Sequence, residues 1–274
     1  MDGITVCDAP PRLVCGRSNK IHRGVAARGS NGHSLRIKEM IQVDDTGPPT
    51  WTRGLSPNLA NVARACTHKR LMSAFEGKAD SAEWVKGVGS EAEVGILAQQ
   101  VLGRLFRNDF AATPESWAAA LVLVAAPRSS NLAKMCWWFI TGRVHRAKSV
   151  LAKMVGDDLS AVNAIGIAVH NLAKSLRQMR SLYADVDSRK ALTAEAAAGK
   201  CLRAPASVYR QSTAKGTLDG IAFPKKSLFV LEIGTASQLD HGRSLVFMEE
   251  SWSRCPASTW IPAMLEGVWR RSLQ

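Results

Sequence analysis

The chain has 274 residues, of which 46% are hydrophobic and 22% are charged, so it is long and apolar enough to bury a substantial core. Lysine and arginine exceed aspartate and glutamate by 13. These basic residues are dispersed along the chain, which is typical of a solvated surface and gives little reason to expect nucleic-acid binding. The apolar runs at 117–126 and 134–141 are broken well before the roughly 20 residues of a membrane span, so no membrane partner is expected.

The N-terminal residues and the cysteines limit the other classes. Residues 1–17 carry an acid at position 2 and no apolar stretch of signal-peptide length, which predicts a cytoplasmic location. The six cysteines are scattered, with no C-x-x-C pair and no histidine at zinc-ligand spacing. We therefore expect neither disulfides nor a bound metal held by such a motif.

The first 85 residues differ from the rest in composition and in apolar periodicity. Gly, Pro, Ser, Asn and Arg recur there without an apolar period, as in 28–34 and 44–51. The sequence predicts an irregular basic segment over 1–85 and a folded domain over 86–274.

Four helices follow in chain order. The first has apolar residues at helical spacing on one face: Val94, Leu97, Val101 and Leu105. The second is predicted over Ser116–Ala126, with Thr113 as its N-cap, and the third over Val144–Val155. The fourth carries an apolar stripe over more than six turns: Leu159, Val162, Ile165, Val169, Leu172, Leu176, Met179 and Leu182. A helix of that length is expected to run through the centre of the domain.

Beyond Ala204 the period changes to that of strands. The turn pair Asp219-Gly220 separates two short apolar runs, and Pro224 shortly precedes the β-rich run Ser227–Ile233. The predicted fold class is mainly α with a small antiparallel β-sheet.

The start of the long helix combines a glycine, an acid and a hydroxyl: Gly156, Asp158 and Ser160. One interpretation is an ordinary helix start, in which Asp157, Asp158 and Ser160 cap free amides and offset the helix dipole. The segment Val155–Gly166 also resembles the pattern A-G-x-[DE]-T-T followed by N-x-x-G of bacterial cytochromes P-450. It has one extra residue before Asn163.

The residues that follow extend this resemblance. The chain has Arg203-Ala204-Pro205, then Arg210, then Leu218-Asp219-Gly220, then Phe223-Pro224-Lys225-Lys226-Ser227. Bacterial cytochromes P-450 have similar steps in this order and at close to this spacing. The resemblance is best from about residue 155 to residue 271 and implies a shortened version of the family's helical fold.

The resemblance also implies a cofactor and roles for particular residues. The cofactor would be haem b, with Asp158 and Ser160 as catalytic residues that relay protons to bound oxygen. Gly156 would leave room for that oxygen, Arg210 would bind a haem propionate, and Gly267 would lie in the haem loop. A ferredoxin or flavoprotein electron donor and a small apolar substrate would be the partners.

Two departures from the family pattern bear on activity. Ala198 and Cys201 stand where the family has the Glu and Arg of its E-x-x-R pair. Arg271 stands at the position of the thiolate cysteine, and an arginine has no lone pair for iron. The chain is therefore expected to be a P-450-related protein that is impaired or inactive as a monooxygenase.

The sequence leaves open other ligands for the haem iron and another class of function. Cys255, in the pair Cys255-Pro256, could supply a sulfur ligand, although a lone small residue in a loop explains it as well. His145 and His170 are further candidates of the same weak kind. The alternative function is a non-catalytic basic protein that binds nucleic acid.

Overall fold

The computed structural model describes residues 78–125, 132–156, 159–205 and 255–274, together with residues 246–247 and seven short strands. The chain divides into two units. One comprises Met1–Ser56 and Ala204–Cys255 and contains the strands; the other comprises Pro57–Arg203 and Pro256–Gln274 and is helical.

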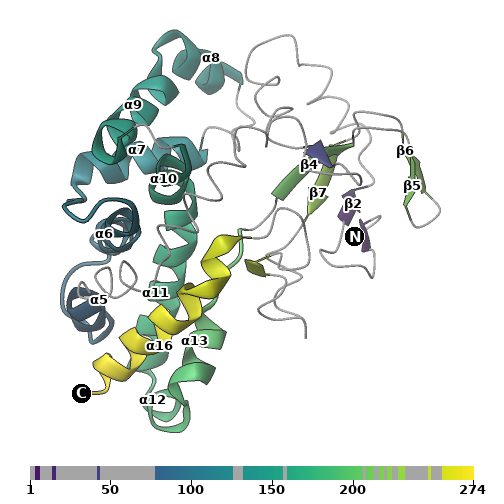
Figure 1. The fold of residues 1–274 in the computed structure, drawn as a ribbon. Helices are drawn as coiled ribbons and strands as arrows, with labels where there is room; N and C mark the ends of the chain where they lie inside the picture. The colour runs from purple at the N-terminus through teal and green to yellow at the C-terminus, as the bar shows by residue number, and fades with distance from the viewer. Residues whose placement is uncertain are drawn as a thin grey trace. The chain divides into compact units, whose positions relative to one another are not determined.

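The helical unit is built from twelve described elements (Figure 1). Its α-helices are α5 (Lys78–Val85), α6 (Val94–Phe106), α7 (Pro114–Ala125), α8 (Leu132–Ile140), α9 (Arg143–Val155), α10 (Leu159–Asn163), α11 (Val169–Ala184), α12 (Val186–Ala191), α13 (Ala194–Cys201) and α16 (Ile261–Ser272). A π-helix, η3 (Ala164–Ala168), joins α10 to α11, and a 3-10 turn, η4 (Pro256–Thr259), precedes α16.

Three of the predicted helices are confirmed with ends that shift by two residues at most. They are α6, α7 and α9. The predicted N-cap of α7 is also confirmed, because the Thr113 hydroxyl accepts a hydrogen bond from the Ser116 amide at 3.1 Å and the Ser116 hydroxyl accepts one from the Thr113 amide at 2.9 Å.

The predicted long helix is confirmed as the run α10–η3–α11, which lies at the centre of the helical unit (Figure 1). Helices α6 and α7 both pack against η3, α6 also packs against α11, and α9 packs against α7. The apolar stripe of the run is buried: Val162, Ile165, Val169, Leu172, Leu176 and Met179 are each at most 4% exposed. Their burial explains why this helix forms in spite of its π-turn.

A second cluster of helices closes the other end of this unit. Helix α16 packs against both α5 and α13, and α13 packs against α11. The side chains at these contacts are fully buried, among them Trp84, Cys201, Leu265 and Trp269. The expectation of irregular chain over 1–85 thus differs from the structure at Lys78–Val85, where an apolar face formed by Ala82, Trp84 and Val85 joins the core.

The other unit contains the strands β1 (Ile4–Val6), β2 (Val14–Gly16), β3 (Gln42–Val43), β4 (Val208–Ser212), β5 (Gly216–Leu218), β6 (Ile221–Phe223) and β7 (Leu228–Leu231). The predicted turn at Asp219-Gly220 and residues 224–227 lie outside the described residues.

Candidate functional site

The π-helix η3 is the most unusual backbone feature of the central helix. A π-turn widens the helix, so its carbonyls are offset from the amides that an α-helix would supply, and such turns are frequent at functional sites. Here the Val169 amide donates to the Ala164 carbonyl five residues earlier. The Ile165 carbonyl accepts a hydrogen bond from outside the helix, from the Gln99 side chain at 2.8 Å.

Gln99 joins three helices at this point. Its side chain comes from α6, is fully buried, and donates from the same nitrogen to the Ser116 carbonyl of α7 at 3.1 Å. The Ser116 hydroxyl lies close enough to donate to the Gln99 side-chain oxygen, and Ser116 is itself fully buried. Neither an amide nor a hydroxyl titrates near neutral pH, so this junction positions helices and supplies no acid or base.

His170 lies two residues beyond η3 and is the ionisable side chain of the central helix nearest to it. Its Nε2 atom lies 3.1 Å from the Ala120 carbonyl, and its ring contacts the Trp117 ring at a centroid distance of 4.8 Å. Because a carbonyl oxygen only accepts, Nε2 carries the hydrogen in this contact. A ligand role for His170 through its Nε2 atom would require this hydrogen bond to break.

Gly166 of η3 lets two neighbouring helices approach the central helix closely. A Cβ atom at this position would lie 2.8 Å from Leu151 Cδ1 and 2.9 Å from Leu123 Cδ1, closer than real Cβ contacts come. Leu151 is fully buried and Leu123 is 6% exposed. This side of the π-turn is therefore filled by leucine side chains of α9 and α7.

Gly156 lies at the end of α9 and outside the central helix. It has φ 74° and ψ 41°, its amide donates to the Ala152 carbonyl at 2.8 Å, and it is exposed. Glycine readily adopts this left-handed conformation and so ends helices. The prediction that the motif segment begins the long helix is wrong at its first residues, because Gly156 stops one helix and the next begins at Leu159.

Asp158 lies outside the described residues, and Ser160 is described only as a backbone position of α10. Arg210 lies in β4 of the strand-containing unit, where its backbone pairs with Phe229 and its side chain is outside the described part. The proton-relay and propionate roles of these three residues stay predictions.

Gly267 lies within α16, where the resemblance to the family predicts a haem loop. The helix runs from Ile261 to Ser272, and Gly267 is half-buried inside it. Met264, Leu265, Val268 and Trp269 are buried on the same helix, a spacing that gives α16 one apolar face against the core. Arg271, in the last turn, is exposed.

The two positions aligned with the E-x-x-R pair are core positions of α13. Ala198 is 2% exposed and Cys201 is fully buried. Burial raises the pKa of the Cys201 thiol to about 12, against a smaller opposing effect of the Arg203 charge. Cys201 therefore stays a thiol at neutral pH and serves as a small apolar packing residue.

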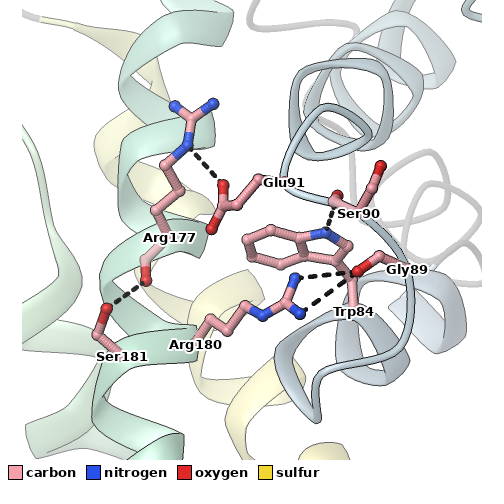
Figure 2. A network of polar contacts seen from close by, with 7 residues as sticks. All are labelled: Trp84, Gly89, Ser90, Glu91, Arg177, Arg180 and Ser181. Carbon is pink, nitrogen blue, oxygen red and sulfur yellow. Dashed lines mark hydrogen bonds and ion pairs between the residues drawn. The ribbon is translucent and has the colours of Figure 1, made fainter.

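A polar network that the sequence did not predict holds the turn between α5 and α6 (Figure 2). The Arg180 guanidinium of α11 lies over the Trp84 ring at 4.5 Å and donates to the Gly87 carbonyl at 3.0 Å and the Gly89 carbonyl at 3.3 Å. The Trp84 indole donates to the Ser90 carbonyl at 2.8 Å. No short-range pattern signals this contact, since Arg180 is more than 90 residues from the turn that it holds.

An ion pair lies beside this network. The Arg177 Nε atom is 3.1 Å from a Glu91 carboxylate oxygen, and the Ser181 hydroxyl donates to the Arg177 carbonyl at 3.2 Å (Figure 2). Both charged side chains are well exposed, so the pair contributes little to stability. The donors drawn in Figure 2 bind acceptors of the same unit, which identifies the network as a structural clamp.

Comparisons with known protein families, with curated proteins and with solved structures find no significant match for this chain. Among the described residues, no three His, Cys, Asp or Glu side chains are grouped as metal ligands would be. No helix in the described part is both long and apolar enough to cross a membrane.

Proposed function

We propose that the chain is a cytochrome P-450-related protein, by ancestry a haem-dependent monooxygenase, whose helical unit persists as a packed scaffold without that catalysis. The proposal rests on the sequence resemblance from about residue 155 to residue 271 for the ancestry. It rests on the chemistry of the aligned positions for the loss of activity.

Arg271 is the observation that carries the loss of activity. It stands at the position that the resemblance aligns with the thiolate, and it is exposed in the last turn of α16. A guanidinium stays protonated and cannot ligate iron, and oxygen cleavage in this chemistry depends on electron donation by a thiolate. Replacement of that cysteine is therefore sufficient to abolish the ordinary monooxygenase reaction.

The core positions support the same proposal. Ala198 and Cys201 pack as small apolar side chains where the family has a buried ion pair, and the loss of both charges together leaves no unpaired charge inside the protein. Leu123 and Leu151 fill the space beside Gly166 on the central helix. These contacts favour an apolar core over a ligand-binding helix face.

Cys201, Cys136 and His170 do not fit as ligands of the haem b that the resemblance implies. Cys201 is fully buried on α13, which packs against α11 and α16, so its sulfur has no open side for iron. Cys136 is exposed on α8, and the Nε2 atom of His170 is bonded to a carbonyl. The resemblance also implies a ferredoxin or flavoprotein electron donor and a small apolar substrate. Both are needed only when haem is bound, so the proposed function includes neither.

The finer part of the fold proposal is a small antiparallel sheet within a shortened P-450-like helical fold. Four antiparallel pairings support it, two of them between strands beyond residue 204, whereas β3 pairs with β4 in parallel. Strand β4 pairs with β7, with Val208 opposite Leu231, and β5 pairs with β6, with Leu218 opposite Ile221. The second pair flanks the Asp219-Gly220 turn predicted from the sequence.

The test is to express the full chain with added haemin, purify it and record its absorption spectrum after reduction, with and without carbon monoxide. We expect no stoichiometric haem and no red-shifted thiolate-type Soret band. Such a band would overturn the proposal. The variant Cys255→Ser would then show whether Cys255, which is half-buried, supplies the sulfur. A band that survives this substitution would direct the search to the other cysteines.

The alternative of a basic nucleic-acid-binding protein draws on the surplus of 13 positive charges. It predicts binding to DNA or RNA that weakens steeply as salt rises. The arrangement of charge on α8 and α9 favours a different partner, and the experiment below separates the two.

A further inference from the structure

Helix α8 presents an apolar face to the surface. Its exposed described side chains are Ala133, Cys136, Trp137 and Ile140, which follow the three- and four-residue steps of a single helix face. Trp137 is 62% exposed and Ile140 is 78% exposed. Large side chains as exposed as these, gathered on one face, are typical of an interaction site.

Trp138, on the opposite side of α8, shows that the helix is oriented by its packing. This side chain is 6% exposed, and the Arg143 guanidinium lies 5.9 Å from its ring centroid. A tryptophan on one side of α8 is therefore buried while its neighbour Trp137 points outward. The outward apolar face is a fixed feature of the helix.

Helix α9 follows directly and carries positive charge. Arg143, Arg146 and Lys153 are exposed on it, together with His145. No aspartate or glutamate occurs from residue 116 to residue 156, whereas six lysines and arginines do. The apolar face of α8 thus belongs to a stretch of chain in which lysine and arginine are not balanced by any aspartate or glutamate.

We propose that α8 and α9 form an interfacial element that binds the surface of anionic lipid membranes. The apolar face of α8 inserts at the boundary between headgroups and acyl chains, where tryptophan is favoured. The basic side chains of α9 bind the phosphate and carboxylate groups of the anionic lipids. The element lies on the membrane and does not cross it, in agreement with the absence of a spanning helix in the described part.

The chemistry of the exposed face favours lipid over nucleic acid. Single-stranded nucleic acids are typically bound by a surface that combines aromatic side chains for base stacking with cations for phosphates. The described exposed side chains of α8 include one aromatic and no cation, and Ala133, Cys136 and Ile140 offer a base or a phosphate nothing to bind. A helix face made of aliphatic side chains and a tryptophan, followed by a basic helix, is typical of elements that bind at the membrane–water interface.

The lipid-binding inference does not depend on the proposed function. Its test is co-sedimentation of the full chain with vesicles of phosphatidylcholine alone and with 30% phosphatidylserine, in low and high salt. We expect binding to the anionic vesicles that weakens as salt rises, and little binding to phosphatidylcholine alone. The haemin spectrum measures haem binding and the vesicle assay measures lipid binding, so the proposed function and the lipid-binding inference can fail independently.

Two pairs of variants assign the binding to this surface. Replacing Arg146 and Lys153 with glutamine should lower vesicle affinity about 25-fold, from about fivefold for each charge near the surface. Trp137→Ser with Ile140→Ser should lower it at least about tenfold. The matched control replaces Lys190 and Lys200, which are exposed on α12 and α13, with glutamine and should bind as the parent does.

A second measurement requires no substitution. Alkylation of the exposed Cys136 by iodoacetamide, followed by peptide mass spectrometry, should slow when anionic vesicles are added. An unchanged rate at Cys136, or absence of vesicle binding, would refute the proposal. Equal binding to both kinds of vesicle would refute its electrostatic part. Binding to DNA or RNA that the α9 variant abolishes, or a dimer that the α8 variant dissociates, would replace it with those partners.

Discussion

Replacing Gln99 with leucine tests whether the junction at the π-turn stabilises the helical unit. The substitution keeps the size of the side chain and removes its amide. Three contacts are lost: the donations to the Ile165 carbonyl at 2.8 Å and to the Ser116 carbonyl at 3.1 Å, and the acceptance from the Ser116 hydroxyl.

The expected cost follows from the burial of these groups. The Ser116 hydroxyl can still donate to the Thr113 carbonyl at 2.9 Å, so the Ile165 carbonyl is the group most affected. A buried polar group left without its partner costs about 1–3 kcal/mol, and the loss of the remaining bonds brings the total to about 2–4 kcal/mol. For a unit of this size the melting temperature should fall by roughly 5–12 °C.

The assay is urea and thermal unfolding followed by circular dichroism at 222 nm, which reports the helical unit. Gln178→Leu is the matched control, because it makes the same change at a half-buried position of α11. A loss of less than about 0.5 kcal/mol for Gln99→Leu, or an equal loss for both variants, would refute the role assigned to the junction.

Three further predictions concern packing, the clamp and cysteine reactivity. Gly95→Ala should destabilise the unit by about 1–3 kcal/mol, because a Cβ there would overlap the Trp117 ring. Arg180→Met should cost about 1–2 kcal/mol and speed proteolysis of the turn between α5 and α6. At pH 8 a thiol reagent should modify Cys136 rapidly and Cys201 only after unfolding. Because burial raises the pKa of Cys201 from 9.0 to about 12, the stability that it contributes is fully present below pH 9 and is lost as the pH rises towards 12.

Each of these predictions has a contrary result. Gly199→Ala on α13, where a Cβ would meet nothing within 4 Å, should leave stability unchanged or raise it, so equal losses at Gly95 and Gly199 would contradict the packing argument. Unchanged proteolysis in Arg180→Met would show that the turn does not need its clamp. Equal modification rates at the two cysteines would contradict the burial of Cys201.

The helices with strong apolar periodicity could be predicted from the sequence. Most members of the two predicted stripes are buried in the structure, and burial is what fixes their helical form: Val94, Val101, Leu105, Val162, Ile165, Val169, Leu172, Leu176 and Met179. Helix α5 could not be predicted in this way. Its buried face depends on α16, which is distant in sequence, and local composition carries no trace of that contact.

The candidate site was harder to predict than the helices. In the sequence, a glycine at position 156 is compatible both with the start of a helix motif and with the C-terminus of a helix. Only its left-handed backbone conformation in the structure distinguishes the two. The side chains of Gln99 and Arg180 donate hydrogen bonds to carbonyls that lie 66 and at least 91 residues away, respectively, and no spacing rule detects such contacts. Sequence patterns report which residues are buried together along one element, and these two roles depend on contacts between elements.

The discontinuity of the helical unit has a consequence for its biosynthesis. Residues 204–255 belong to the other unit, yet α16 returns to cover α5 and α13. During synthesis, the apolar faces that bear Trp84 and Cys201 therefore stay incompletely buried until residues 256–274 have been made. Contacts of such long sequence separation fold slowly and leave apolar surface exposed to aggregation in the interval. Nascent chains of this protein should therefore engage chaperones until α16 has left the ribosome.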